Sequence, residues 1–322
     1  MNHRNQFYDY LKGIAIFIVV MGHVIQCFSA TPEEDYTWIV AFHMPLFIAV
    51  SGYFFLSSVQ KCSSTCDFIN KKFRRIYLPS LSWGMFNVLL IGGGKVFSHK
   101  SLDWLYLLDS LFTGLWFLTI LFLFSVMGCL IHQACKKMCW LAWIIIILAI
   151  YFIPAGFMVN EMKFLLPFFV MAIWLSKYDW QNIKWWQTFI AIIVFILSLQ
   201  IYTFDYSIYR MGSNVFSMEY FQHTWVRFVS GVSGSIATIG FTKILFQLQL
   251  LKKWTVYIGS MTLPVYALHQ KPLIINKFFE YSTGSIVLWI LLSFFLIGFS
   301  VIIYKILSKN IYLSLYLFGE NK

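Results

Sequence analysis

Residues 9–55 read DYLKGIAIFIVVMGHVIQCFSATPEEDYTWIVAFHMPLFIAVSGYFF, and this stretch decides the fold. It consists of two long apolar segments joined by a short acidic hairpin, with His23 in the first segment and His43 in the second. An ionisable side chain in a membrane span costs free energy unless it faces the interior of a helix bundle or a wet cavity. The two histidines are therefore the leading candidates for a functional site.

The composition is that of a membrane protein. The chain has 322 residues, of which 60% are hydrophobic and 11% are charged, and its mean hydropathy is +0.73. Soluble domains do not contain so much apolar sequence. The apolar run at 13–30 extends beyond signal-peptide length without a clear cleavage site, so we expect the first span to be retained. The formal net charge of +11 accompanies no nucleic-acid module, and no nucleic-acid partner is expected.

The apolar segments predict an all-α, polytopic integral membrane protein. A span needs ~20 apolar residues, and this rule gives about ten transmembrane helices. Residues 1–322 are expected to form a single transmembrane domain with no soluble domain. The predicted spans are approximately 12–29, 38–57, 76–94, 114–133, 140–158, 163–177, 186–204, 224–247, 254–270 and 284–307.

The distribution of basic residues predicts the orientation. If both termini are cytoplasmic, the inner loops and tails hold 17 of the 24 Lys and Arg residues, the outer loops hold six, and Arg227 lies within a span. Cytoplasmic loops of membrane proteins carry an excess of Lys and Arg. We therefore predict that both termini face the cytoplasm.

Four polar side chains fall at one predicted depth. His23 follows Lys12 by 11 residues, which places it roughly 16 Å from the inner face at the helical rise. His43 lies early in the descending second span, and Arg227 lies early in the descending eighth span. His269 ends the ascending ninth span. We expect all four side chains in the outer half of the bilayer, at a common site.

The types of these residues indicate proton transfer and charge stabilisation. A histidine in a cavity that restricts water is the usual general base for a hydroxyl group. Arg227 and Lys12 remain cationic and can hold a phosphate, a carboxylate or a developing oxyanion. Taken alone, His269 is also explained as a hydrogen-bonded residue at the membrane interface.

The first inner loop carries a basic cluster with two interpretations. Lys71, Lys72, Arg74 and Arg75 stand directly before a predicted span. Such a cluster is a topology signal that also contacts anionic lipid headgroups. Alternatively, Arg and Lys here bind the phosphates of a cofactor such as coenzyme A.

Four of the six cysteines form two C-x3-C pairs. These are Cys62 with Cys66, and Cys135 with Cys139. The spacing is loose for a zinc site, and no histidine stands beside the first pair. We expect reduced thiols and no metal.

Five motifs in the same order resemble acyltransferase family 3, whose members include O-acetyltransferases of bacterial surface polysaccharides. The motifs are DYLKGIAIFIVVMGH, FHMPLFIAVSGYFF, KKFRRIYLP, GLWFLTILF and IGSMTLPVYALHQ. The resemblance implies a ten-helix core, acetyl-CoA or another short acyl-CoA as donor, and a sugar hydroxyl as acceptor.

Carried over residue by residue, the resemblance implies roles for the membrane residues. The family's basic residue and histidine, with ten residues between them, fall on Lys12 and His23. The family more often has Arg at the first position, and Lys lacks its planar fork. His43 matches the histidine that opens the second helix, and His269 matches a histidine of the ninth helix, expected to bind substrate.

The remaining matches lie at the inner loop and the fourth span. Arg74 and Arg75 match the family's basic loop motif, and with Lys71 and Lys72 they are expected to bind the donor. Trp116 matches the tryptophan that opens the fourth span, and we expect it to contact substrate.

Together these features predict a membrane O-acyltransferase of the bacterial cytoplasmic (inner) membrane. It would move an acyl group from cytoplasmic acyl-CoA to a surface polysaccharide or a lipid-linked glycan, in contact with membrane lipids. In this hypothesis His23 deprotonates the hydroxyl or itself accepts the acyl group. His43 assists as a second base or hydrogen-bond partner, and Arg227 holds oxyanion or acceptor charge.

Two other functions remain open at this stage. An outward-facing polar cluster also lines the path of a polysaccharide exporter or flippase, which performs no acyl chemistry. A structural or sensory membrane protein is the second alternative, and it leaves His23, His43 and Arg227 without a role. The sequence does not distinguish acetyl from succinyl, and it does not identify the acceptor.

Overall fold

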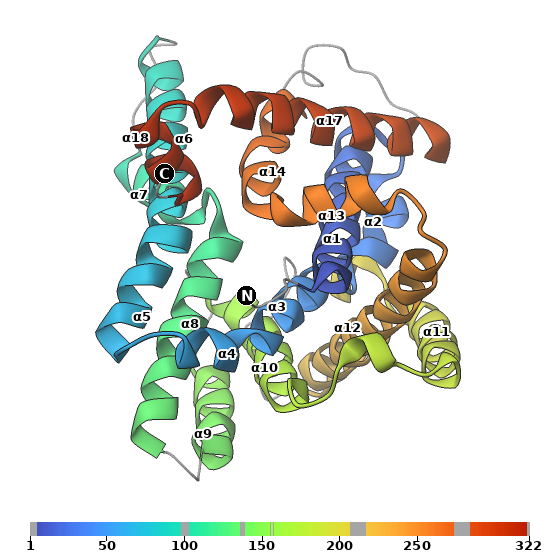
Figure 1. Ribbon diagram of the computed structural model, residues 1–322. Helices are drawn as coiled ribbons and strands as arrows, with labels where there is room; N and C mark the ends of the chain where they lie inside the picture. The colour runs from blue at the N-terminus through green and yellow to red at the C-terminus, as the bar shows by residue number, and fades with distance from the viewer. Residues whose placement is uncertain are drawn as a thin grey trace. The chain divides into compact units, whose positions relative to one another are not determined.

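The computed structural model describes residues 5–97, 103–135, 139–154, 156, 158–206, 217–273 and 284–320. Every regular element in these ranges is a helix, which confirms the all-α prediction (Figure 1). The chain divides into two compact units. Unit 1 comprises Met1–Tyr53 with Phe168–Tyr304, and unit 2 comprises Phe54–Pro167 with Lys305–Lys322.

Unit 1 contains the first three helices and the second half of the chain. Its elements are α1 (Gln6–Phe28), α2 (Pro32–Val40), α3 (His43–Tyr53), the end of α10 (Val159–Leu175), the 3-10 turns η3 (Trp180–Asn182) and η4 (Phe204–Tyr206), α11 (Trp185–Leu199), α12 (Met218–Gln247), α13 (Lys252–Ser260), α14 (Thr262–Leu268), α15 (Gln270–Leu273) and α17 (Ile286–Leu307).

Unit 2 contains the basic loop and the helices that follow it. Its elements are α4 (Phe55–Gln60), α5 (Thr65–Lys72), the π-helical turn η1 (Phe73–Tyr77), α6 (Leu78–Phe97), α7 (Trp104–Thr113), α8 (Trp116–Cys135), α9 (Cys139–Tyr151), the start of α10 and α18 (Ile311–Phe318).

Helices α1 and α13 pack at very close range in unit 1. A Cβ atom on Gly259 would lie 1.6 Å from the carbonyl oxygen of Asp9, and one on Gly13 would lie 2.2 Å from that of Thr255. Small residues let helix backbones approach closely inside a membrane. These two glycines therefore set the distance between α1 and α13.

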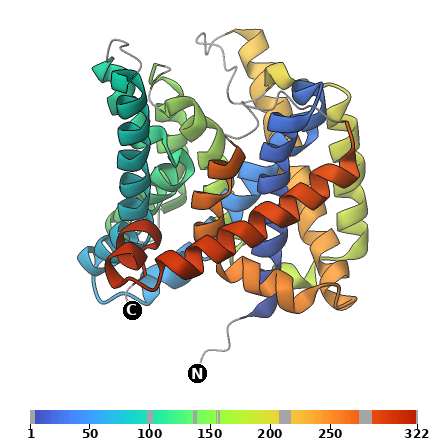
Figure 2. The ribbon, with the colours of Figure 1, turned by 90° about the horizontal axis from the view of Figure 1, so that it is seen from above.

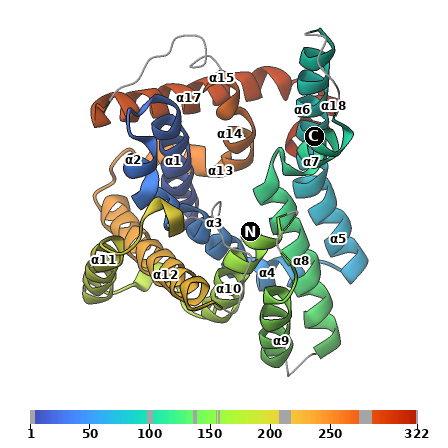
Figure 3. The same cartoon turned by 180° about the vertical axis from the view of Figure 1, so that it is seen from behind.

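Small residues also shape α12, which has 30 residues and a length of about 45 Å at the helical rise. Ser230 donates to Ser198 of α11 across 2.9 Å, and Gly240 lies against Thr188 of α11. The two helices lie side by side (Figure 3). Helix α12 is thereby fixed against α11.

Helix α17 crosses α1 and α13 (Figure 2), and aromatic side chains make the contacts. The ring centroid of Phe294 lies 5.0 Å from that of Phe17 and 5.1 Å from that of Trp254. These contacts belong to a buried cluster of apolar residues centred on α1. Helix α1 is thus the central element of unit 1.

Hydrogen bonds join α6 to two other helices of unit 2, α18 and α8. Trp83 of α6 donates its indole N–H to the carbonyl oxygen of Leu317 in α18 across 3.0 Å. Ser80 of α6 and Thr119 of α8 share a buried hydrogen bond of 3.0 Å. Helix α6 therefore connects the C-terminal helix with α8.

Five helical segments of the described residues are long and apolar enough to cross a membrane: Gln6–Phe28, Pro32–Gln60, Trp116–Cys135, Met218–Gln247 and Ile286–Leu307. Two shorter apolar helices are Trp140–Tyr151 and Trp185–Leu199. The protein is a multi-pass membrane protein, and the number ten stays a prediction.

The predicted spans differ from the helices in three places. The span 38–57 is interrupted between α2 and α3 and again before α4, and the span 254–270 is interrupted at Met261. Helix α9 ends at Tyr151, and residues 155 and 157 of the span 140–158 lie outside the described residues.

Helix α7 was not expected. Its capping residue Asp103 accepts from two backbone N–H groups, which satisfies orphan donors at its start.

Substitution of Gly259 should separate the two central helices. In Gly259→Ala the new methyl group collides with the Asp9 carbonyl, and overpacking of this kind costs at least ~1–3 kcal/mol. We expect a lower melting temperature for the purified protein. Gly298→Ala in α17 is the matched control, because a Cβ there meets nothing within 4 Å. Equal melting temperatures for the two variants would contradict the packing argument.

Candidate active site

His23 lies in the C-terminal third of α1, and both of its ring nitrogens are engaged. Its Nδ1 is 2.8 Å from Oε1 of Gln26, and its Nε2 is 3.0 Å from Nε2 of Gln270. An amide oxygen only accepts, and an amide NH2 only donates. His23 is therefore neutral, with the proton on Nδ1 and the basic lone pair on Nε2.

His269 lies beside His23. The ring centroids are 5.1 Å apart, and Nδ1 of His269 donates to the carbonyl oxygen of Val265 across 3.0 Å. The side chain is completely buried. Among the described residues, its Nε2 has no hydrogen-bond partner. A buried acceptor left unpaired costs free energy, so the site is suited to a ligand that donates a hydrogen bond.

His43 opens α3 and is also buried. Its Nδ1 donates to the carbonyl oxygen of Ile39 across 2.8 Å, and its Nε2 accepts from the Tyr36 hydroxyl across 3.3 Å. Helix α3 packs against α1, which carries His23. All three histidines thus adopt one neutral tautomer, with the lone pair on Nε2.

Arg227 is buried in α12, with an exposed fraction of 1%. Its Nε donates to the carbonyl oxygen of Tyr206 at the end of η4, and the ring of Tyr206 lies 4.0 Å from that of His223. This contact anchors Arg227 to the backbone of η4. It does not by itself link Arg227 to the pair of His23 and His269.

Lys12 lies on the same face of α1 as His23. Both residues belong to one uninterrupted helix, and 11 residues turn a helix through three full turns plus about 20°. Lys12 forms an ion pair of 3.3 Å with Asp9, whose side chain has an exposed fraction of 5%. The x10 spacing thus aligns the two residues, and Asp9 already offsets the charge of Lys12.

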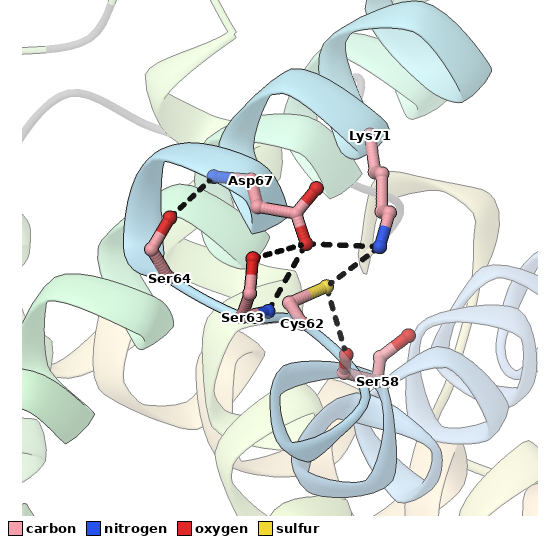
Figure 4. A network of polar contacts seen from close by, with 6 residues as sticks. All are labelled: Ser58, Cys62, Ser63, Ser64, Asp67 and Lys71. Atoms are coloured by element: carbon pink, nitrogen blue, oxygen red, sulfur yellow. Dashed lines mark hydrogen bonds and ion pairs between the residues drawn. The ribbon is translucent and has the colours of Figure 1, made fainter.

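In unit 2, Lys71 belongs to a small polar network at the start of the basic loop (Figure 4). Its Nζ lies 2.9 Å from Asp67 and 3.8 Å from Sγ of Cys62. The hydrogen bond to Lys71 lowers the pKa of Asp67, and the same bond raises the pKa of Lys71. Lys71 therefore remains charged but is shared with a carboxylate.

The other three cations of the loop lie nearer to η1. Lys72 is half-buried with its Nζ 5.3 Å from the ring centroid of Phe68. Burial, and secondly the charge of Arg75, lower the pKa of Lys72 to about 8. Arg74 and Arg75 are exposed on the π-helical turn. Short π-helical segments are frequent at functional sites.

Trp116 begins α8 in unit 2, with its ring packed edge-on to Phe117 at 6.2 Å.

In the described residues, no group of three or more His, Cys, Asp or Glu side chains is arranged to hold a metal ion. Cys62, Cys66 and Cys135 are free thiols. The cysteine pairs therefore have no metal site among these residues.

The expected site residues fall into two groups. Lys12, His23, His43, Arg227 and His269 belong to unit 1, and the basic loop with Trp116 belongs to unit 2. Within unit 1, the structure brings His23 and His269 into ring contact and places His43 on α3, which packs against α1.

Sequence reasoning missed four polar residues at or beside these elements. Gln26 and Gln270 hold His23, and Tyr36 holds His43. Gln26 follows His23 by three residues, and this spacing brings side chains together on a helix. The contact between Gln26 and His23 could therefore have been predicted from the sequence. Lys163 of α10, the first residue of the predicted span 163–177, was assigned no role, but only 2% of it is exposed.

Comparison with known proteins identifies the family. The model of a family described as "Acyltransferase domain" matches residues 5–305. The chain belongs to acyltransferase family 3. Its membership accounts for the five motifs, because the match spans both units and nearly the whole chain.

Two curated relatives are nodulation proteins NolL. The protein of Mesorhizobium japonicum is 27% identical over 197 residues, which cover 58% of this chain and 52% of the relative. That of Sinorhizobium fredii is 33% identical over 89 residues, 26% of this chain and 24% of the relative. The chain thus spans about half or less of each relative's length. No solved structure matches this family member significantly.

Proposed function

We propose that the protein is a membrane O-acyltransferase that moves a short acyl group from acyl-CoA to a hydroxyl group of a glycan. The observation that carries this proposal is the pair of His23 and His269, in a chain that belongs to an acyltransferase family. The pair presents one poised lone pair on His23 and one unpartnered acceptor on His269. Deprotonation of a hydroxyl group requires such a basic lone pair, and an additional acceptor can bind a second hydroxyl group of the same ligand.

The reaction balances with one histidine acting as base and then as acid. Nε2 of His23 takes the proton of the glycan hydroxyl as its oxygen attacks the thioester carbonyl. A new C–O bond forms, the C–S bond breaks, and the thiolate of coenzyme A leaves. The imidazolium of His23 returns the proton to that thiolate. The products are the glycan ester and free coenzyme A.

Neighbouring residues have supporting roles in this proposal. His269 accepts a second hydrogen bond from the glycan and orients it, which uses the buried Nε2. Gln270 donates to His23 Nε2 in the structure, so it must move aside as the hydroxyl binds. His43 stabilises the local charge, and Arg227 supplies positive charge for the tetrahedral oxyanion or the acceptor.

The donor is proposed to bind through unit 2. Lys72, Arg74 and Arg75 suit the phosphates of coenzyme A, with Lys71 shared between Asp67 and the ligand. Lys12, aligned with His23 along α1, would lie beside the acyl-bearing arm. Trp116 is proposed to line the path of that arm.

We propose acetyl-CoA as donor and a surface polysaccharide or lipid-linked glycan as acceptor, at the bacterial cytoplasmic membrane. The name of the NolL relatives specifies neither substrate. Membership of an acyltransferase family favours the enzyme over an exporter or flippase, because a transporter leaves its cargo chemically unchanged. Both alternatives share an outward-facing polar cluster, so the product must distinguish them.

Loss of the base should abolish the ester. In His23→Ala, transfer should fall by at least ~10²–10⁴-fold, the usual contribution of a general base. The measurement is mass spectrometry of surface glycan from cells that express the native protein, the variant or neither. His132→Ala, an exposed site on α8, is the control and should retain the alkali-labile ester. An unchanged glycan mass with less glycan at the surface of the deletion strain would favour the transporter.

Gln26 should act as a positioning residue through the His23 tautomer. In Gln26→Met the Nδ1–H loses its acceptor, and we expect kcat to fall about 10- to 100-fold, less than for loss of a buried orienting carboxylate. In Gln26→Glu the hydrogen bond returns with a negative charge that stabilises imidazolium. Activity should then recover in part, with the acidic limb of the pH–rate profile moved to higher pH. Equal, unshifted profiles for both variants would rule out this role.

A further inference from the structure

An apolar groove lies on unit 1, apart from the histidines. It has a volume of about 950 Å³ and runs between α10, α11 and α12. Its wall includes Phe168 and Ala172 of α10, Ile190 and Val194 of α11, and Val229 and Ile236 of α12. The proposed acyl transfer does not use this groove.

The groove is lined mainly by apolar side chains. Ser233 and Ser235 line it, but their hydroxyl groups donate to backbone carbonyl oxygens of α12, each across 2.6 Å. The charged residues of the lining are Lys177 and Asp179, both at one end. An apolar channel with a charged mouth suits an amphipathic ligand.

Three lysines lie at or beside the mouth. Lys177 is an exposed lining residue, Lys184 follows the lining residue Ile183 and is the N-cap of α11, and Lys243 donates to the carbonyl oxygen of Ile183 across 2.7 Å. The opposing charge, Asp179, accepts from the Tyr8 hydroxyl across 2.8 Å and from the N–H of Gln181 across 3.1 Å. Three lysines against this one aspartate leave a net positive charge, and the mouth therefore favours an anion.

Aromatic residues mark the mouth as the membrane interface. Tyr178, Trp180 and Trp186 line it, and such amphipathic rings gather at headgroup depth. On α12 the lining runs from Trp225 to Ile239, a length of roughly 21 Å at the helical rise. One leaflet with its headgroups is about 20–22 Å thick, half of the whole bilayer. The length of the groove along α12 therefore equals the thickness of one leaflet.

We propose that the groove binds one anionic phospholipid, with its phosphate at Lys177 and an acyl chain along α12. The predicted orientation places this mouth at the inner leaflet. Acyl-CoA shares the same chemistry, an anionic head on an alkyl chain. However, a chain in the groove would hold its thioester at the Lys177 end, where the lining contains no histidine. The phospholipid is therefore the occupant.

Native mass spectrometry of the full chain in mild detergent tests this assignment. The probes are phosphatidylglycerol and phosphatidylcholine with identical acyl chains, supplied in equal amounts. We expect one retained phosphatidylglycerol per chain in preference to phosphatidylcholine. Lys177→Gln should lower that preference about five-fold, the contribution of one lysine near an anionic surface. Lys309→Gln, at an exposed site in unit 2, should leave it unchanged.

A matched pair on α11 separates the groove from the general lipid surface. Ile190→Trp fills the groove and should reduce retention of both lipids, whereas Ile193→Trp, exposed on α11 but outside the lining, should not. Val194→Trp replaces Ile190→Trp if the latter does not fold. Equal retention by the two tryptophan variants, or no preference for phosphatidylglycerol, overturns the proposal. Stronger retention of palmitoyl-CoA would assign the groove to a donor instead. None of these readouts depends on acyl transfer.

Discussion

The structure depends on how an imidazole is accommodated in an apolar helix bundle. Each of the three histidines satisfies its Nδ1–H locally: His43 and His269 donate to the carbonyl oxygen four residues earlier, and His23 donates to Gln26. A buried donor left unpaired is costly, so these bonds fix both tautomer and orientation. They leave each Nε2 lone pair as an acceptor, which Gln270 occupies at His23 and Tyr36 occupies at His43. Among the described residues, that of His269 has no partner. The general-base role proposed for His23 uses an Nε2 lone pair that is oriented in this way.

Helix packing brings these rings together. Gly13 and Gly259 let α13 approach α1, and the short helix α14 then carries His269 back to His23. The interruptions that broke two predicted spans are part of this arrangement. The break after α14 also places Gln270 against His23. Non-helical backbone at membrane depth is tolerated where it is buried in protein, and the buried His269 lies at this break.

The sequence predicted the class of fold and the family, whereas the common depth of the histidines in the bilayer stays a prediction. Membrane spans follow from apolar length, and His23 and His43 were evident because polar groups are rare in such segments. The contact between His23 and His269 depends on tertiary packing between segments about 250 residues apart, which a single sequence does not encode visibly. Gln26 and Gln270 were overlooked because neutral amides carry no signal as strong as charge. The role of Arg227 stays a prediction, as its contact is with the backbone of Tyr206.

The most direct test of the account is sided acyl transfer in proteoliposomes of one orientation. Labelled acetyl-CoA is supplied only on the face that exposes the basic loop, and the glycan acceptor only on the other face. The account predicts label on the glycan with the native protein and none with His23→Gln. Label on the glycan with His23→Gln at the native rate, or transfer only when both substrates share one face, would contradict it.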